Sequence, residues 1–284
     1  MAQTREIKNR IESVKKTKKI TRAMKMVAAA KFKKAVDQAT HARPYAEALE
    51  ELLAKAVSGL KPEDFPTLMK PNGSSVHAVI VIAGDRGLCG GFNTNVLKFS
   101  NQFLAQQNEG IELHLFGVKT VQFFRNKPYT VADSKTFFTE NVSLEAIRPI
   151  LASFVDRFLN GEIGQLSLCF SEFHSALSSK PTAKTLLPIT PKVGEKSPYN
   201  TIFEPSVEVV LGWAIQEYLG CAINKAFLDS KAAEEGARMA AMESATDNAE
   251  SMIRELTLLY NRNRQAQITS ELSEIVAGAE ALVQ

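Results

Sequence analysis

One candidate site for chemistry is a glycine-rich loop that follows an apolar segment. The loop consists of Asp85, Arg86, Gly87, Leu88, Cys89, Gly90 and Gly91. Glycine-rich turns between a strand and a helix can bind phosphate groups through backbone amides. This loop has no Gly-Lys-Ser or Gly-Lys-Thr, and it lacks the Gly-x-Gly-x-x-Gly spacing of dinucleotide-binding folds. We therefore favour a tight turn whose glycines allow close backbone contact over a nucleotide site.

Cysteine and histidine side chains give little further sign of catalysis. Cys89 has no histidine near it in sequence, so its activation as a nucleophile would need a base brought close by the fold. The cysteines are odd in number and far apart, which favours buried free thiols: Cys89, Cys169 and Cys221. The histidines share no metal-ligand spacing: His41, His77, His114 and His174. We predict no metal and no cofactor, and expect His114 to be a hydrogen-bonded strand residue.

The positive charge of the chain is concentrated at one end. Residues 1–34 contain nine Lys and three Arg against two Glu, a formal charge of +10, whereas the rest of the 284 residues carries −7. Such a segment is either a solvated face or a contact for an acidic partner. Phe32 is the single aromatic residue there, so no base-stacking surface exists and we do not expect nucleic acid.

The N-terminal segment, residues 1–57, has the pattern of a long helix. It has no glycine and one proline, Pro44, where we expect a kink or break before the helix resumes. Its apolar positions advance by three or four residues and predict one buried stripe: Ile7, Ile11, Val14, Thr17, Ile20, Met24 and Val27. A linker rich in proline and glycine follows at residues 58–75.

The C-terminal segment, residues 206–284, is also helical in pattern. It contains no proline, and as one helix it would reach roughly 118 Å at about 1.5 Å per residue, too long for the inside of one globule. Its predicted stripe consists of small and apolar residues: Ala233, Ala237, Ala240, Ala241, Ser244, Ala245, Ala249, Met252, Leu256, Leu259, Ala266, Leu272, Ile275 and Ala279.

Two helices with narrow apolar stripes can bury these stripes against each other as an antiparallel coiled coil. The C-terminal helix is the longer of the two, so part of it must lie beyond the overlap. Its end is too apolar for solvent and implies a protein partner: Ile275, Val276, Leu282 and Val283.

Residues 76–200 alternate apolar runs with helical stretches, the pattern of an α/β sheet with crossover connections. The predicted strands are 76–83, 111–118, 129–132, 165–173 and 185–189, and the predicted helices are 93–107, 118–126 and 143–160. The longest apolar run, near Val79 to Ala83, falls far short of the roughly 20 residues that span a bilayer. With no apolar leader in the first residues, we expect an unprocessed, cytoplasmic chain.

Residues 260–271 have polar side chains on every face of the predicted helix, whereas the rest of this helix has an apolar stripe. Gln265 and Thr269 share one helix face, and Arg262 lies one turn before them. The segment is either a solvated stretch or a directed contact surface, and the alignment of hydrogen-bonding groups favours contact.

Three motifs together resemble the gamma subunit of F-type ATP synthases, the rotor shaft. They are Ile-Thr-Arg-Ala-Met-Lys-Met-Val-Ala-Ala at 20–29, Asp-Arg-Gly-Leu-Cys-Gly-Gly-Phe-Asn at 85–93, and Ala-Thr-Asp-Asn-Ala at 245–249 with Arg-Gln-Ala-Gln-Ile-Thr-Ser-Glu-Leu at 264–272. They occur in the family's order, and the resemblance covers essentially the whole chain.

The resemblance implies an α/β fold: a long antiparallel coiled coil of terminal helices with a central Rossmann-like domain. It implies a non-catalytic rotor that transmits torque between a proton-driven c-ring and a catalytic hexamer of three alpha and three beta subunits. The central domain would contact the epsilon subunit and the c-ring, with residues 196–204 as part of that foot. The family's beta-subunit contacts fall on Met24, Lys25, Arg238, Arg264, Gln265, Thr269 and Glu271.

The same resemblance implies a peripheral position on the cytoplasmic face of a bacterial plasma membrane. No cysteine pair is inserted near residues 190–210, so we expect no thiol regulation of the chloroplast kind. Two other classes of protein stay open. A tethering coiled coil would explain the terminal helices, and a nucleotide-dependent enzyme would explain the glycine loop.

Overall fold

Two long helices dominate this computed structural model, which describes residues 2–58, 60–107, 110–138, 142–175, 178–190 and 203–283. Helix α1 spans Ala2–Ser58 and helix α5 spans Val207–Val283. The chain divides into two compact units. The coiled-coil unit consists of Met1–Ala28 and Arg238–Gln284, and the α/β unit consists of Ala29–Ala237.

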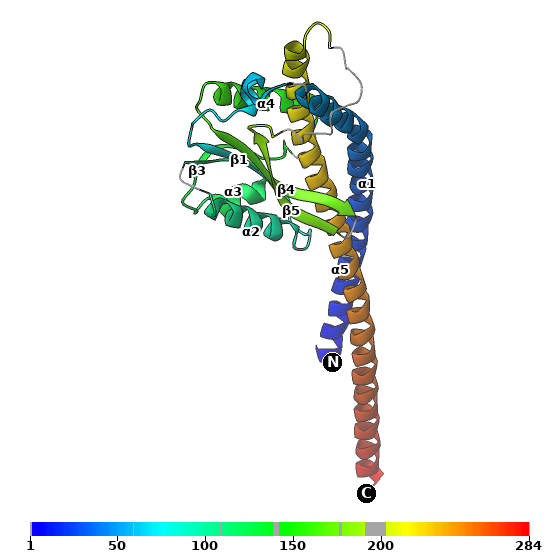
Figure 1. Ribbon diagram of the computed structural model, residues 1–284. Coiled ribbons are helices and arrows are strands. Elements are labelled where there is room, and N and C mark those ends of the chain that lie inside the picture. Colours follow the sequence, from blue (N-terminus) through cyan, green and yellow to red (C-terminus); the bar gives the residue numbers. More distant parts are fainter. Residues whose placement is uncertain are drawn as a thin grey trace. The chain divides into compact units, whose positions relative to one another are not determined.

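A five-stranded sheet forms the centre of the α/β unit (Figure 1). Its order is β3-β2-β1-β4-β5, with the first four strands parallel and β5 antiparallel to β4. The bounds are His77–Ile82 for β1, Ile111–Phe116 for β2, Thr130–Lys135 for β3, Gln165–Ser175 for β4 and Ser178–Leu187 for β5. The predicted α/β fold with long terminal helices is confirmed, although the sequence pattern did not predict that β4 and β5 pair directly as antiparallel neighbours.

Helices cover both faces of this sheet, because alternate side chains of β1 point to opposite sides. Val79 and Val81 pack with α2 (Phe92–Ala105) and α3 (Val118–Phe124). Ile80 and Ile82 pack with α4 (Leu144–Leu159) and the first turns of α5. The predicted helices at 93–107, 118–126 and 143–160 are therefore confirmed, and Ser143 caps α4 by accepting a hydrogen bond from the Ala146 amide.

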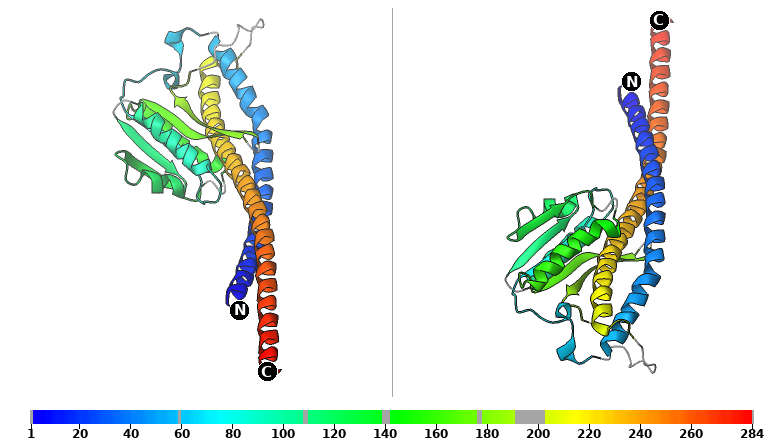
Figure 2. Two further views of the ribbon diagram at one scale, coloured as in Figure 1. Left: turned by 90° about the horizontal axis from the view of Figure 1, so that it is seen from below. Right: turned by 90° about the horizontal axis from the view of Figure 1, so that it is seen from above.

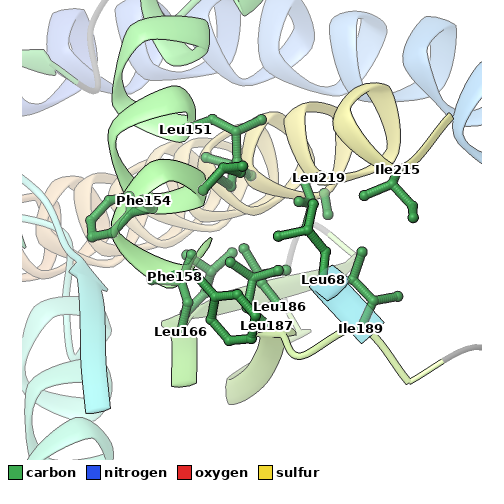
Figure 3. Packing of buried hydrophobic residues seen from close by; sticks show 14 of the residues in the cluster. Leu68, Leu151, Phe154, Phe158, Leu166, Leu186, Leu187, Ile189, Ile215 and Leu219 are labelled. Atoms are coloured by element: carbon green, nitrogen blue, oxygen red, sulfur yellow. The ribbon is translucent and has the colours of Figure 1, made fainter. Parts of the chain in front are cut away.

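The larger hydrophobic core lies on the α4 side of the sheet (Figure 3). Leu151, Phe154 and Phe158 of α4 meet Leu166 of β4, while α5 contributes Ile215 and Leu219. The proline-rich linker takes part as well. It forms two 3-10 turns, Pro62–Asp64 and Thr67–Met69, and the second inserts Leu68 and Met69 into the core. The segment predicted to be a linker, residues 58–75, thus packs in one core with α1 and the sheet.

Helix α1 continues through Pro44 without a break. The prediction of a break there was wrong. A proline removes one backbone donor from a helix, and the packing of neighbouring residues can outweigh that loss. Leu49 and Leu53 lie on the next turns and are buried, which supplies such packing.

In the coiled-coil unit α1 and α5 run in opposite directions, and α5 extends beyond the start of α1 (Figure 2). The predicted stripe on α1 is right at Ile7 and Ile11, which are buried, and at Val14, which is partly buried, and it leaves the observed seam at Thr17. A seam shared by two helices repeats every 3.5 residues, so it continues through Lys18, Thr21, Lys25 and Ala28. Ile20 and Val27, predicted to be buried, are 60% and 58% exposed.

Candidate functional site

Polar contacts fix the pairing of the two helices in the coiled-coil unit. Thr4 donates to Gln267 at 3.1 Å, and the hydroxyl oxygens of Thr21 and Thr246 lie 2.8 Å apart. Two ion pairs flank the threonines: Lys18 with Glu250 at 3.1 Å and Lys25 with Glu243 at 2.6 Å. Threonine side chains are short, so the Thr21–Thr246 contact depends closely on how the two helices are aligned, and the ion pairs beside it add to this preference.

Three of the predicted partner contacts lie in or beside this seam, two on α1 and one, Arg238, on α5. Met24 is partly buried, and the Lys25 ammonium is paired with Glu243. Arg238 is buried, with 8% of its surface exposed. The outward surface of α1 instead carries the large apolar residues Met26 and Val27. Sequence reasoning did not separate these outward residues from the seam residues beside them.

The predicted contacts near the end of α5 all lie on exposed turns: Arg264, Gln265, Thr269 and Glu271. Two of them already make hydrogen bonds along the helix. The Thr269 hydroxyl donates to the Gln265 carbonyl oxygen at 2.9 Å, and Glu271 accepts from the Gln267 amide at 2.9 Å. The guanidinium of Arg264 and the side-chain amide of Gln265 are exposed on the same segment, so this band can present hydrogen-bonding groups to a partner.

Apolar side chains are exposed on α5 after Gln267, which makes the last described hydrogen bond to α1. They are Ile268, Leu272, Ile275 and Val276, and Ile275 is 67% exposed. Leu282 and Val283, also predicted to need a partner, lie outside the residues whose side chains are described. A row of exposed aliphatic residues on one helix is typical of a protein-contact surface.

The glycine loop of the α/β unit connects the end of β1 to the start of α2. The Asp85 carboxylate is buried and accepts hydrogen bonds from the backbone amides of Val118 at 3.0 Å and Phe137 at 2.8 Å. Arg86, Gly87 and Leu88 are exposed, whereas Cys89 is buried, Gly90 and Gly91 are exposed, and Gly90 has a φ of 55°. Asp85 thus ties the end of β1 to the start of α3 and to the turn after β3.

The position where a phosphate would approach is filled by the chain's own polar groups. Gly84 lies two residues after the end of β1, and its amide donates to the Asn93 side-chain oxygen at 2.9 Å. A Cβ placed on Gly84 would lie 3.0 Å from that oxygen and 3.0 Å from a carboxylate oxygen of Glu234 on α5. A carboxylate repels phosphate, so this geometry disfavours a nucleotide site in the loop.

Cys89 has the environment of a packed residue. It is 2% exposed, its thiol faces the Arg86 carbonyl oxygen at 3.8 Å, and it accepts from the Asn93 amide at 3.1 Å. Neither group is a base that could activate a thiol. All three cysteines are free and buried, as predicted, and burial raises the pKa of Cys169 to about 12.

Buried titratable groups in the sheet pair with one another. Arg157 of α4 donates to both carboxylate oxygens of Glu112, at 2.6 and 2.8 Å, and these hydrogen bonds lower the pKa of Glu112. His114 meets the same carboxylate at 2.7 Å, which confirms the prediction of a satisfied strand histidine. Burial lowers the pKa of His114, and likewise that of His77, which contacts the Ser167 hydroxyl at 2.9 Å. This network stabilises the fold.

Within the described residues, no group of three or more His, Cys, Asp or Glu side chains is arranged to bind a metal ion. None of the helices in that part of the chain is both long and apolar enough to span a bilayer.

Comparison with known proteins identifies the family. The sequence matches the family described as ATP synthase over residues 3–282. The ATP synthase gamma chain of Anaeromyxobacter sp. (strain Fw109-5) is 42% identical over 289 residues, which cover 99% of this chain and 100% of that one. This chain belongs to the ATP synthase gamma chain family. The gamma chain of Moorella thermoacetica is similar to it at 41% identity, with 99% and 100% of the two chains covered.

The fold agrees with this assignment to the gamma chains. A chain of the Euglena gracilis mitochondrial ATP synthase, solved as OSCP/F1/c-ring in rotational state 3, superimposes with a TM-score of 0.66 at 18% identity, covering 99% of this chain and 95% of that one. As a gamma chain, the protein is a subunit of ATP synthase, and the activities of that complex are ATP synthesis and ion transport.

Three positions important to this geometry were missed by the sequence analysis. Thr21 and Thr246 were not recognised as a pair, although a 3.5-residue repeat starting from Ile7 would have placed Thr21 in the seam. Glu234 could not have been assigned to the glycine loop, because 150 residues separate it from Gly84 and only the fold brings them together.

Proposed function

We propose that the chain is the central-stalk rotor of an F-type ATP synthase and is not itself catalytic. It transmits torque between a proton-driven c-ring and a hexamer of three alpha and three beta subunits. In this proposal residues 1–57 and 206–284 form the shaft, and residues 76–200 form the foot that contacts the epsilon subunit and the c-ring.

The observation that carries the proposal is the exposed apolar end of α5. The last hydrogen bond described between α5 and α1 is made at Gln267, and Leu272, Ile275 and Val276 further along α5 are more than half exposed. A helix of this kind gains free energy when an apolar collar encloses it. The alpha and beta subunits are the partners that the family assignment supplies.

A shaft couples chemistry to rotation through contacts alone. Each orientation presents a different side of an asymmetric helix pair to each of three equivalent catalytic subunits. Only such differences in contact free energy can shift their nucleotide affinities. The carboxylate of Glu234 beside Gly84 supports a role without nucleotide binding in this chain.

The proposed partner contacts divide into two groups. Met24 and Lys25 lie in the segment that carries the +10 charge, which suits acidic loops of the beta subunit. Arg238, Arg264, Gln265, Thr269 and Glu271 contribute to helix packing or to hydrogen bonds with beta-subunit loops.

We place the protein on the cytoplasmic face of a bacterial plasma membrane, attached only through the complex. Part of the proposed foot, residues 196–202, lies outside the described residues; Phe203 and Glu204 are described.

Co-expression with alpha and beta subunits from a bacterial relative tests the proposal. We expect native mass spectrometry to find one copy of this chain with three alpha and three beta subunits, and ATP hydrolysis to depend on its presence. Self-association without the other subunits would favour a tether instead. ATP hydrolysis by the isolated chain at the rate of the complex would favour an enzyme and overturn the rotor.

A further inference from the structure

A cleft opens between helix α4 and the edge of the sheet in the α/β unit. Its volume is about 490 Å³. Strand β3 is the edge strand and five of its six residues are exposed, whereas α4 packs with β1 and β4 and leaves space beside β3. We call this space the α4–β3 cleft. The strands contribute His114, Phe116, Asp133 and Lys135 to its lining, and α4 contributes Ala146 and Phe154 among others.

Aromatic rings form the floor of the cleft. Phe116 and Phe154 are both buried. The ring of Phe138 packs edge-on against Phe116, with ring centres 5.2 Å apart, and the ring of His114 packs edge-on against Phe154 at 4.6 Å. Another aromatic ring can pack against such a floor by the same edge-to-face or offset contacts, and these contacts stabilise a pair of rings beyond the burial of area alone.

The charged groups beside the cleft neutralise each other. The Lys135 Nζ atom lies 3.3 Å from a carboxylate oxygen of Asp133. Burial lowers the pKa of His114 below the ordinary 6.5, so its ring is neutral at pH 7. No other described residue of the lining is charged. A charged ligand would lose its hydration without meeting an unpaired opposite charge, so the cleft favours a neutral ligand.

The position of the proton on His114 follows from its partner. Arg157 donates two hydrogen bonds to the carboxylate of Glu112, which lower the pKa of Glu112 and keep it ionised, so that this carboxylate only accepts. Its Oε1 atom lies 2.7 Å from the Nε2 atom of His114, so Nε2 carries the proton. In a neutral imidazole the other ring nitrogen, Nδ1, is then a hydrogen-bond acceptor.

The Nδ1 atom of His114 is available to a ligand. It makes no hydrogen bond to any residue that the structure describes. Every fully buried side-chain nitrogen or oxygen in that part of the chain has a partner, so Nδ1 must be accessible, and His114 lines the α4–β3 cleft. The ligand should therefore carry a hydrogen-bond donor. A hydroxyl also accepts, and the hydroxyl of Ser153, on the same cleft, can donate to it.

We propose that the α4–β3 cleft binds a small phenol, with its ring on the aromatic floor and its hydroxyl donating to Nδ1 of His114. A ring without a donor would displace water from Nδ1 and leave this acceptor unpaired. A hydroxyl on a saturated ring would lose the contacts between aromatic rings. None of these residues belongs to the proposed shaft, so failure of this proposal would leave the rotor proposal standing.

Nuclear magnetic resonance on the complete purified chain, isotopically labelled in its histidine rings, tests this proposal with phenol as the probe. We expect the signals of His114 to shift with saturable, one-site binding. The signals of His77, which packs against Phe103 of α2 on the opposite face of the sheet, should not move. A shift of both histidines in parallel, or of neither, would overturn the proposal.

Two related ligands separate the hydroxyl from the ring. Anisole has the aromatic ring but no hydroxyl proton, and it should bind at least about threefold more weakly than phenol. Cyclohexanol has the hydroxyl on a saturated ring, and it should also bind at least about threefold more weakly. Binding of either ligand as tight as that of phenol would overturn the proposal.

Two substitutions on α4 locate the site. Ala146→Leu places a larger side chain in the cleft and should abolish the binding of phenol. Ala152→Leu makes the same change on the same helix but in the lining of a different cavity, so it should leave the affinity unchanged. Equal effects of the two substitutions would show that phenol does not bind in the α4–β3 cleft.

A third substitution tests the hydrogen bond. His114→Phe keeps an aromatic ring against Phe154 and leaves the pair of Glu112 and Arg157 in place, but it removes the acceptor. Phenol should then bind no more tightly than anisole. A preference for phenol that survives this substitution would overturn the assigned role of Nδ1.

The assembled complex provides the last comparison. Phenol binding to the alpha–beta complex with the same sensitivity to Ala146→Leu supports a ligand site. Binding to the free chain that is lost in the complex would mean that another subunit covers the cleft, and a ligand site there would be rejected.

Discussion

The hydroxyl oxygens of Thr21 and Thr246 lie 2.8 Å apart across the helix pair of the coiled-coil unit. Each hydroxyl also has an acceptor in its own helix, the Met242 carbonyl oxygen at 2.7 Å for Thr246 and the Lys18 carbonyl oxygen at 3.1 Å for Thr21, so either hydroxyl can be the donor across the pair. Thr21 is buried, and ion pairs lie one turn to either side of it. A directed polar contact at this point penalises any shift of one helix along the other.

Replacement of Thr21 by valine tests this contact. Thr21→Val has nearly the same shape, and we expect it to lower the free energy of unfolding by about 1 kcal/mol, because the hydrogen bond is lost inside the seam. Urea unfolding followed by circular dichroism provides the measurement. The control is Thr17→Val, which removes an exposed hydroxyl that donates to the Ser13 carbonyl oxygen of its own helix at 3.2 Å. This variant should change the free energy of unfolding little.

The double variant Thr21→Val with Thr246→Val separates pairing from packing. If the two hydroxyls interact, the double variant should be less destabilised than the sum of the single variants. Simple additivity would show that the short distance contributes no coupling.

Local patterns in the sequence predicted local structure well. The helix after Ser143 and the apolar run of β1, which is buried along its whole length, follow from neighbouring residues. The seam of α1 was predicted as far as Val14 and then lost, because steps of three and four residues also pass through the apolar but outward Ile20 and Val27. Apolar residues facing a partner and apolar residues facing a seam look alike in one sequence.

Contacts between distant segments could not be predicted. The family resemblance identified the outward residues Arg264 and Gln265, but no spacing rule could place Glu234 beside Gly84 or open a cleft between α4 and β3. These features depend on how the sheet, α4 and α5 pack, and packing is set by the whole fold.

The Glu112–Arg157 pair should make stability depend on pH in the acid range. The pKa of Glu112 is lowered, chiefly by the hydrogen bonds from Arg157, relative to an ordinary value of 4.5. Its contribution is therefore complete above about pH 4.5 and is lost as the pH falls through the lower folded value. Glu112→Gln should cost about 2 kcal/mol at pH 7 and progressively less in acid. A constant difference between the two proteins from pH 7 to pH 3 would contradict this assignment.

The buried histidine His77 should weaken the fold over a higher pH range. Burial lowers its pKa below the ordinary 6.5, so the unfolded chain binds a proton more readily than the folded chain. Stability is then greatest above about pH 6.5 and falls as the pH drops toward the folded value. His77→Gln keeps a polar group near Ser167 but cannot titrate, so unfolding curves at pH 7, 6 and 5 should show a smaller decrease than for the unmodified chain.

Replacement by alanine should destabilise the protein at one glycine of the α/β unit and have little effect at another. Gly117 has a φ of 104°, and a Cβ there would collide with the Ala83 carbonyl oxygen. We expect Gly117→Ala to lose about 3 kcal/mol or more, because both the backbone strain and the collision disfavour it. No atom lies within 4 Å of a Cβ on Gly87, so Gly87→Ala should change stability by less than about 0.5 kcal/mol. Thermal unfolding of both variants measures the two changes in stability. Similar losses of stability would show that Gly117 does not lie close to the Ala83 carbonyl oxygen.

Two isoleucines of α5 should separate stability from assembly. Ile253 is partly buried in the coiled-coil unit, so Ile253→Ser should destabilise the isolated chain by about 1–2 kcal/mol. Ile275 is exposed and contributes little to that stability, so Ile275→Ser should unfold like the unmodified chain. If the exposed end of α5 enters a collar of alpha and beta subunits, Ile275→Ser should nevertheless reduce the yield of the complex in co-expression. Normal assembly of Ile275→Ser would show that Ile275 does not contact the other subunits. A loss of stability in the isolated Ile275→Ser chain would show that Ile275 packs against other residues of the same chain.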